Sequence, residues 1–515
     1  MLHILGAAVK IEGLILTGGT TANDGGGVAV HGGALTMEDT QVSGNSSAGW
    51  GGGISNGGTL KLDHSTVSGN TASEQGGGIV NGGTLKMDAS TISGNSAAAG
   101  GGVWNTADSE LMKMAGSTVA DNTARAGSGG GLQNDGAATV TGSTFSGNSA
   151  EWYGGGGLWN GGTLKVEAST VSGNSSPGCG GGILNERELV LAESVVSGNG
   201  AAWGGGVCNW APDGTLTIAN TELSTNIATE GTGGGLQNDG TAIVTGSAFS
   251  GNSALWGGGG LRNGGTLALE ASTVSENTAT EGDGGGIQNN GTVVLDNSTV
   301  SGNQAGESGG GIYSEGSATI QNGSELSGNT SARGGGLFNS PGGAATMTGS
   351  TVSGNSVTYG GGGLHNLGTM IVSGSTITGN SAGWGGGFMN PGGILTIDAS
   401  LVSSNMTSEI GGGILNYDGT LTVTGSALLG NIAGMDGDGV YIATDNVTSV
   451  TLSCIVGNGD RAVFNERSAS QNFTSNWWGD ASGPSGAGSG LGDWVSANID
   501  FLPWLLEPPA ICASD

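Results

Sequence analysis

The sequence predicts an all-β chain folded as a single-stranded, right-handed parallel β-helix (a solenoid) of about 18 coils, each with three short strands, and a C-terminal cap. The first observation is a repeat, because the phrase GWGGGISNGGTL at residues 49–60 returns in close variants about every 26 residues. The second is composition. Of 515 residues 114 are Gly, yet Val, Ile, Leu and Met recur at fixed intervals, which a disordered chain does not show.

The third observation is a two-residue alternation of apolar and polar side chains in each repeat, which is typical of strands. Leu60 and Leu62 alternate with Lys61, and further segments centre on Val67 and on residues 79–81. Strands of two to five residues cannot bury a face alone, so each coil must stack on the next. Parallel crossovers of this kind are normally right-handed.

Three ladders of polar residues run through the repeats. Aligning the phrase SGN gives seventeen asparagines at steps of 25 to 27 residues, the SGN ladder, which includes Asn45, Asn70, Asn95 and Asn148. A second set, the GGG ladder, follows the triple glycine and includes Asn56, Asn81 and Asn160, with Ser314 as its one departure. The position five before each SGN asparagine is Ser or Thr in all seventeen repeats, the hydroxyl ladder. We expect all three to point inward and to satisfy backbone groups at the bends.

Charge and composition exclude several functional classes. The net charge is −30, with 11 Lys and Arg against 41 Asp and Glu, so no basic surface is expected for nucleic acid. No apolar run approaches the roughly 20 residues that span a bilayer. The start, MLHILGAAVKIEG, has no basic n-region, so we expect that an export signal or other upstream sequence is missing. No cofactor and no metal-ligand spacing is expected.

The four cysteines give one candidate disulfide. Cys179 and Cys208 occupy different places in their repeats, so the repeat does not predict that they pair. A bridge between Cys454 and Cys512 that ties down the tail is possible.

The repeats resemble those of the polymorphic outer membrane proteins and their secreted relatives, which are defined by paired GGA[ILV] and FxxN tetrapeptides. Here the first is GGGI, GGGL or GGGV, and the second is usually VSGN, with FSGN at residues 145–148 and 249–252. The match runs from about residue 9 to residue 476. It implies a cell-surface or extracellular β-helix. We expect no membrane β-barrel in this chain, so the self-anchoring of that family does not carry over.

The C-terminal region also resembles bacterial surface β-helices that finish with NWWG and a later GP. Asn476 comes only 18 residues after Asn458, so we expect the stack to end there, with Trp477 and Trp478 covering the open core. This predicts a repeat domain at 1–476 and a cap and tail at 477–515.

A first candidate surface is the variable letter of GGG[IL]xN, here called the x stripe. By alternation it faces outward, and many of its members are aromatic: Trp104, Trp159, Tyr313, Phe338 and His365. Exposed stripes of this kind often mark binding surfaces. The alternative is that a loop or the C-terminal tail covers them.

A second candidate is the residue just before the glycines, here called the pre-glycine row. Its members are Trp50, Tyr153, Cys179, Trp203, Trp256, Tyr359 and Trp384. Aromatic rings two coils apart would lie about 10 Å from one another and suit stacking on alternate sugars of an extended glycan. The alternative is that they anchor loops.

Two further patterns suggest other functions. Outward Thr-x-Ser pairs such as Thr66 and Ser68 form an array similar to ice-binding faces, although strand propensity also explains them. Carboxylates on adjacent coils, Asp63 with Asp88 and Glu270 with Asp296, could serve acid–base chemistry in a carbohydrate-active enzyme. Solvated strand ends explain them equally well.

The sequence therefore favours a non-enzymatic, exported or cell-surface rod that presents an adhesive or ligand-binding face. Its expected partner is an extracellular glycan or another cell-surface protein, and neither nucleic acid nor a membrane span is expected. The alternative is a β-helical polysaccharide lyase or hydrolase, and the third possibility is an ice-binding protein.

Overall fold

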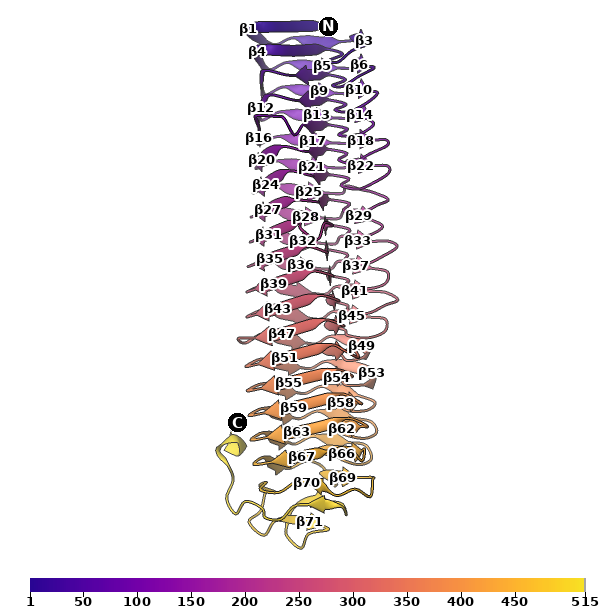
Figure 1. Cartoon of the computed structure of the whole chain (residues 1–515), viewed down its shortest axis with the longest axis vertical. Coiled ribbons are helices and arrows are strands. Elements are labelled where there is room, and N and C mark those ends of the chain that lie inside the picture. The colour runs from indigo at the N-terminus through magenta and orange to yellow at the C-terminus, as the bar shows by residue number, and fades with distance from the viewer. Residues whose placement is uncertain (514–515) are drawn as a thin grey trace. The chain divides into compact units, whose positions relative to one another are not determined.

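The computed structural model describes residues 1–513 and is an all-β parallel solenoid, with about 19 turns in the described part of the chain. This is close to the 18 coils expected. One coil illustrates all of them (Figure 1): β8 (Thr59–Asp63), β9 (Thr66–Ser68), β10 (Thr71–Ala72) and β11 (Ile79–Asn81). The short strand that follows most SGN phrases, as β10 follows Asn70, is an addition to the three strands that the sequence predicts.

Each strand pairs in parallel with its counterparts in the neighbouring coils. Strand β8 pairs with β12 (Thr84–Asp88) so that Leu60 lies beside Leu85 and Asp63 beside Asp88. Strand β9 pairs with β13 (Thr91–Ser93), and β10 with β14 (Ser96–Ala97), in other sheets. Because most coils repeat the same register, each position of the repeat forms a row along the stack within each unit.

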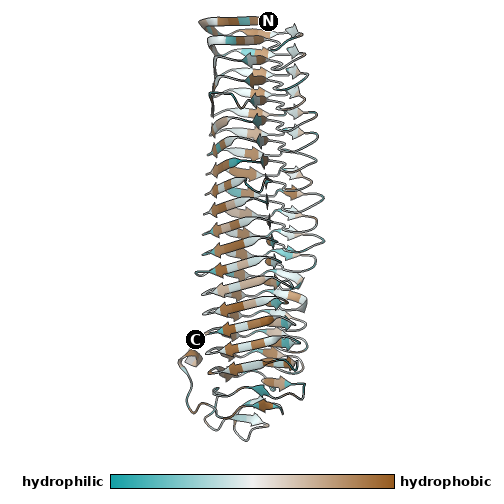
Figure 2. Ribbon diagram, in the orientation of Figure 1, coloured by the Kyte–Doolittle hydropathy of each residue, from teal (hydrophilic) through white to brown (hydrophobic). Residues whose placement is uncertain are grey.

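The core consists of the inward rows. Ile54, Leu60, Leu62 and Val67 are fully buried, and the outward residues between them are partly exposed. Figure 2 shows the resulting alternation of apolar and polar bands along the strands. Burying one such aliphatic side chain contributes about 1.5–3 kcal/mol, so the rows of every coil add to the stability of their neighbours.

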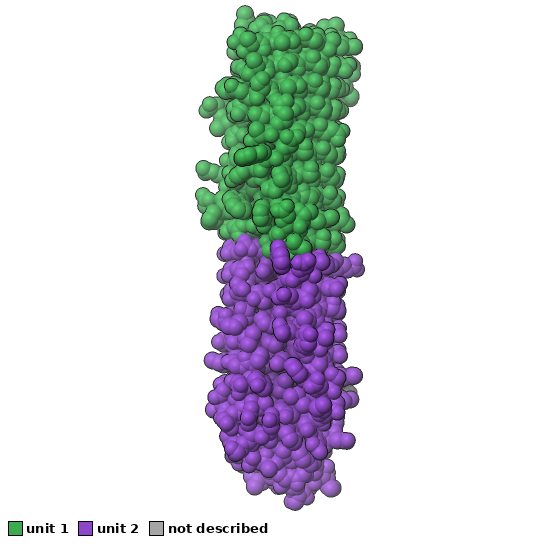
Figure 3. All heavy atoms as spheres, turned by 90° about the vertical axis from the view of Figure 1, so that its right-hand side faces the viewer, with its two compact units in different colours: residues 1–255 green, residues 256–515 purple. Residues whose placement is uncertain are grey.

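The chain divides into two compact units, Met1–Leu255 and Trp256–Asp515 (Figure 3). Both have the same coil. In the first unit β20 (Ala137–Thr141) pairs in register with β24 (Thr163–Glu167), and in the second β55 (Thr369–Ser373) pairs with β59 (Ile394–Asp398). The boundary predicted at residue 476 stays a prediction.

The triple glycine is required by the bend that precedes β7 (Ile54–Asn56). Gly51 has a φ of 65°, a left-handed conformation that favours glycine. A Cβ at Gly52 would overlap the backbone of Thr71 and of Gly77 in the next coil. The coils therefore approach at this corner more closely than any larger residue allows.

The SGN ladder joins consecutive coils through both ends of each amide. The backbone N–H of Asn70 donates to Oδ1 of Asn95 at 2.9 Å, and Nδ2 of Asn70 donates to the same oxygen at 3.0 Å. Nδ2 of Asn70 also donates to the carbonyl of Val42 in the preceding coil at 3.0 Å. One asparagine thus satisfies backbone groups on both sides of its own coil.

The other two ladders use simpler contacts. In the GGG ladder Nδ2 of Asn56 donates to Oδ1 of Asn81 at 2.7 Å. At the departure from this ladder, Ser314 still accepts the amide of Asn289, at 3.1 Å. On the far side of this departure Oδ1 of Asn339 is buried without a hydrogen-bond partner among the described residues, because Ser314 donates to the carbonyl of Gly316 instead. In the hydroxyl ladder the backbone N–H of Ser65 donates to Oγ of Ser90 at 3.1 Å.

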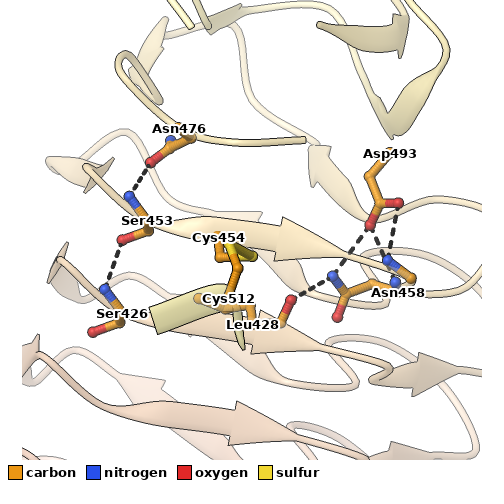
Figure 4. The surroundings of a disulfide bond; sticks show 9 residues. Ser426, Leu428, Ser453, Cys454, Asn458, Asn476, Asp493 and Cys512 are labelled. Carbon is orange, nitrogen blue, oxygen red and sulfur yellow. Dashed lines mark hydrogen bonds between the residues drawn. A yellow bond between two sulfur atoms is a disulfide. The ribbon is translucent and has the colours of Figure 1, made fainter. Parts of the chain in front are cut away.

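The last rungs differ from the prediction. Asn476 does not continue the SGN ladder. It accepts the backbone N–H of Ser453 at 2.9 Å and so replaces a hydroxyl rung (Figure 4). The SGN ladder ends instead on Asp493, whose Oδ2 accepts the backbone N–H of Asn458 and whose Oδ1 accepts that of Gly457, both at 3.1 Å. A carboxylate suits a final rung because only acceptors are needed there.

The stack also continues beyond Asn476. Strands β72 (Gly492–Val495) and β73 (Ile499–Asp500) pair in parallel with β69 (Val463–Asn465) and β70 (Gln471–Asn472). Trp478 is fully buried, with its ring 6.4 Å from that of Phe473, whereas Trp477 is partly exposed. The possible bridge between Cys454 and Cys512 is present.

We expect Asn148→Ala to destabilise the first unit by about 3 kcal/mol or more, because it leaves the backbone N–H of Asn122 and the carbonyl of Val119 buried without these partners. Urea unfolding followed by circular dichroism measures the change. Asn23→Ala, at an exposed position, is the matched control and should stay within about 0.5 kcal/mol of the parent protein. Equal losses in the two variants would contradict the structural role of the ladder.

Asp493 gives the C-terminal region a defined pH dependence. Burial raises the pKa of Asp493 from 3.8 to about 6, against the hydrogen bonds from Asn458 and Gly457, which lower it. The folded state therefore binds a proton that the unfolded state releases, and this contribution to stability is lost as the pH rises through that window.

Asp493→Asn should remove this loss, so that the parent protein falls in stability relative to the variant between pH 4 and pH 7. Urea midpoints at the two pH values test it. Asp480→Asn is the control with the opposite sign, because hydrogen bonds from Ser482 lower the pKa of Asp480. An unchanged difference between the parent protein and Asp493→Asn would contradict the assignment.

Candidate functional site

The x stripe is not a uniform exposed face. In the second unit its aromatic members stack on one another: the rings of Tyr313 and Phe338 are 5.4 Å apart, and those of Phe338 and His365 are 4.6 Å apart. Phe338 is only 7% exposed and His365 only 4%. Burial lowers the pKa of His365 to about 4, and its Nδ1 lies 3.2 Å from the carbonyl of Gly360. These two residues are buried, as the alternative of a covered stripe requires, and do not form the exposed binding face that was also considered.

The pre-glycine row needs a correction of register. Cys179 pairs with Gly154 and Trp203, and Trp384 pairs with Gly360. Tyr153, Trp256 and Tyr359 each precede a fourth glycine, so they lie one residue earlier, Tyr153 and Trp256 in a loop and Tyr359 in β53 (Ser356–Gly360). All three are about half exposed.

The first unit contains an open cavity of about 700 Å³ beside the row and the stripe. Its floor includes Ser55 and Val80, which are consecutive members of the x stripe, and Trp104 is the next member. Trp50 of the pre-glycine row meets Trp104 edge to face, with ring centroids 5.6 Å apart. Two short side chains followed by a tryptophan therefore create the cavity.

Hydrogen bonds fix both indole rings. Nε1 of Trp50 donates to Glu74 at 2.6 Å, and its backbone N–H donates to Asp24 at 2.8 Å. Nε1 of Trp104 donates to Asp135, which also accepts the side-chain amide of Gln133 at 3.1 Å. Trp50 remains 41% exposed. With their N–H groups already bonded, the rings offer their apolar surfaces to the cavity.

The cavity also offers acceptors. Asp24, Asp108, Asp135 and Gln133 line it, and Oε1 of Gln133 is a buried atom with no hydrogen-bond partner among the described residues. Aromatic surface beside several acceptors suits a ligand with apolar C–H faces and many donors. We call this site the Trp50–Trp104 pocket.

A second, smaller apolar cavity, of about 140 Å³, lies over a disulfide in the same unit. Cys179 and Cys208, which the repeat did not predict to pair, are bonded. The pre-glycine residue of one coil thus contacts the x residue of the next. Tyr153, Trp203 and Trp210 line the cavity.

Trp159, in contrast, packs against this disulfide cluster. A Cβ on Gly161 would overlap its ring, so the tryptophan lies directly over that glycine. Burial raises the pKa of the adjacent Glu186 despite a hydrogen-bond contribution from Trp159, which lowers it. Trp159 therefore packs against its neighbours and is not an exposed ring on which a ligand could stack.

One member of each carboxylate pair accepts hydrogen bonds that favour its ionised form. Asp63 and Asp88 are neighbours in register, but Asp63 accepts Lys61 and His64, whose hydrogen bonds lower its pKa. Asp296, the neighbour of Glu270, accepts amides from the following coil that likewise lower its pKa. Glycoside cleavage requires one carboxyl group that stays protonated, and hydrogen bonds of this kind favour the ionised form.

Asp436 and Asp438, two carboxylates close together in the sequence, both have partners within the chain. Asp438 accepts the backbone N–H groups of Ala433 and Arg461, and Asp436 pairs with the guanidinium of Arg461. Among residues 1–513 there is no cluster of three or more side chains suited to a metal ion. Nor does any helix in that range have the length and apolar character needed to cross a membrane.

The Thr row of the Thr-x-Ser array runs in register from Thr66 through Thr91 to Thr118, but the Ser position is lost at Ala120 and the Thr position at Val195, the neighbour of Thr170 in the next coil. Nothing else about this face points to a ligand.

Two family models match the chain. One, described as a right handed beta helix region, covers residues 3–171. The other, a Chlamydia polymorphic membrane protein repeat, covers residues 297–315, which include the VSGN and GGGI tetrapeptides of one coil. The chain is a right-handed β-helix repeat protein similar to the polymorphic membrane proteins. The expected hand and the expected resemblance are thereby confirmed. No curated protein sequence matches this β-helix repeat protein.

Sequence reasoning named Trp50 and Trp104 but assigned them to different surfaces. Gln133 is the next member of the x stripe after Trp104. Sequence reasoning missed Asp24 and Asp135 because single acidic residues in a repeat carry no recognisable spacing. The signal that could have found the pocket is the sequence of sizes Ser55, Val80, Trp104 along the x stripe. A large side chain next to small ones in that stripe leaves space over the small ones.

We expect the double variant Cys179→Ala/Cys208→Ala to lose about 3–4 kcal/mol of stability, as a loop closure over 29 residues implies. Thermal unfolding with and without reductant measures this loss. Reductant should lower the unfolding midpoint of the parent protein. It should lower the midpoint of the double variant less, because that variant already lacks this bridge. An unchanged midpoint in the double variant would show that the bridge does not constrain the unfolded chain.

Proposed function

We propose that this surface-type β-helical protein is a non-enzymatic, exported or cell-surface binding protein that holds extracellular glycans in the Trp50–Trp104 pocket. The single observation that carries the proposal is the edge-to-face tryptophan pair in a cavity of about 700 Å³. That volume lies in the range of ordinary ligand sites.

The chemistry of the pocket suits a sugar. A pyranose ring presents apolar C–H faces, which pack on aromatic rings, and hydroxyl groups, which donate to carboxylates and amides. The indole rings of Trp50 and Trp104 are held by Glu74 and Asp135. Little side-chain entropy is then lost on binding, which favours affinity.

Binding is favoured over cleavage by the position of the carboxylate pairs. Asp63 lies on β8, is held by Lys61, and does not line the pocket. A lyase or hydrolase stays the alternative, and its support is the fold alone, which does not determine an activity. Another cell-surface protein is the alternative partner.

Screening of a glycan array, followed by calorimetry on the best ligand, tests the proposal. Trp50→Ala and Trp104→Ala should each weaken binding about 5- to 10-fold, as expected for loss of one aromatic contact. Trp384→Ala is the matched control, because Trp384 occupies the same row and also donates its indole N–H to a glutamate, Glu409. It should leave affinity unchanged.

Three results would contradict the proposal. The first is that no glycan binds the parent protein. The second is that Trp384→Ala weakens binding as much as Trp50→Ala does. The third is release of new reducing ends from a polysaccharide, which would favour the enzyme.

A further inference from the structure

The Trp50–Trp104 pocket is lined by negative charge without compensation from its own walls. Asp24, Asp108 and Asp135 line it, and none of the described lining residues is Lys, Arg or His. Glu74, which holds Trp50, adds a fourth carboxylate next to the rim. The whole chain carries a net charge of −30, so the surrounding potential has the same sign.

The carboxylates differ in how far they are engaged. Asp24 accepts a hydrogen bond from the backbone N–H of Trp50. Asp135 accepts hydrogen bonds from the indole N–H of Trp104 and the side-chain amide of Gln133, so both carboxylates already have partners within the protein. Asp108 lies in the exposed loop between β15 (Val103–Asn105) and β16 (Leu111–Ala115). It is the lining carboxylate most open to a ligand in solvent.

A cation would gain from this arrangement in two ways. Carboxylates attract a positive group, and the effect grows where the cavity excludes water. The face of an indole ring attracts a cation more strongly than any other aromatic side chain does. A protonated amine also donates hydrogen bonds, which the exposed carboxylate of Asp108 in the lining accepts. Uronic acids, in contrast, would be repelled.

We propose that the Trp50–Trp104 pocket selects glycans bearing protonated amino groups, such as oligosaccharides of glucosamine, over neutral and uronic-acid glycans. This inference rests on the proposed function, since it names the class of sugar that the same site accepts. The tryptophans provide the stacking surface, and Asp108 provides the charge and the acceptor that favour the amine.

Calorimetry with three tetrasaccharides tests the selectivity: the glucosamine oligomer, its N-acetylated counterpart and a galacturonic acid oligomer. At about pH 5.5 and low salt the glucosamine oligomer should bind at least about 10-fold tighter than the acetylated one, and the acid should not bind. Raising the salt should weaken the amine-bearing ligand alone, because salt screens its charge. Choline serves as a probe for a cation without a sugar.

Variants separate charge from stacking. Asp108→Asn should weaken binding of the glucosamine oligomer about 5-fold and leave the acetylated oligomer unchanged, as loss of one exposed charge implies. Asp213→Asn is the matched control, an exposed aspartate in the corresponding loop after β30 (Val207–Asn209), and should change neither. Trp50→Ala should weaken both oligomers.

The outcomes distinguish the two proposals. Equal affinity for the glucosamine and acetylated oligomers would overturn the charge selectivity and keep the glycan function. Absence of binding to every saccharide would overturn both proposals, as would binding of choline alone. Tighter binding of the galacturonic acid oligomer would also overturn the selectivity.

Discussion

Hydrogen bonding by buried asparagine amides is the interaction on which the stacking of the coils depends. At each bend the chain leaves a strand and exposes an N–H and a carbonyl inside the core. An asparagine there accepts from the preceding rung and donates to a carbonyl in the preceding coil, as Asn95 and Asn70 do. The contact requires a fixed vertical register between coils, so it sets the alignment of all the other rows. Burying these groups unpaired would cost about 1–3 kcal/mol each.

The same register separates scaffold from surface. Inward rows and the glycine corner are determined by the stacking, whereas outward positions vary without disturbing it. Variation along the x stripe is then enough to build a cavity. The side chains of Ser55 and Val80 are short, whereas that of Trp104 is large and lies close to Trp50 from an earlier coil. Where the stripe carries bulky rings in succession, as at Phe338, the rings stack on one another. A repeat protein can therefore acquire a site by substitution at a few positions, with its core unchanged.

The end of the stack obeys the same rule. A ladder of amides needs a final group that accepts without having to donate to a further coil, and Asp493 has two such oxygens. The adjoining hydroxyl ladder ends on the amide of Asn476. Each ladder therefore ends on a different chemical group from its other rungs, a carboxylate after the amides and an amide after the hydroxyls. The disulfide of Cys454 joins the last coils to the tail.

The sequence by itself determined the coil, its inward rows and its three ladders, because every repeat meets the same physical requirement and many copies reinforce one signal. It named Trp50 and Trp104 as unusual residues on the same grounds. It could not determine which residues of different coils meet, since those contacts depend on side-chain size and on one extra glycine, as at Trp256. Only the tertiary structure decided the pairing of Cys179 with Cys208, the burial of the x stripe in the second unit, and the meeting of two tryptophans over a short-chained floor. These are contacts between unlike positions of the repeat, and periodicity carries no information about them.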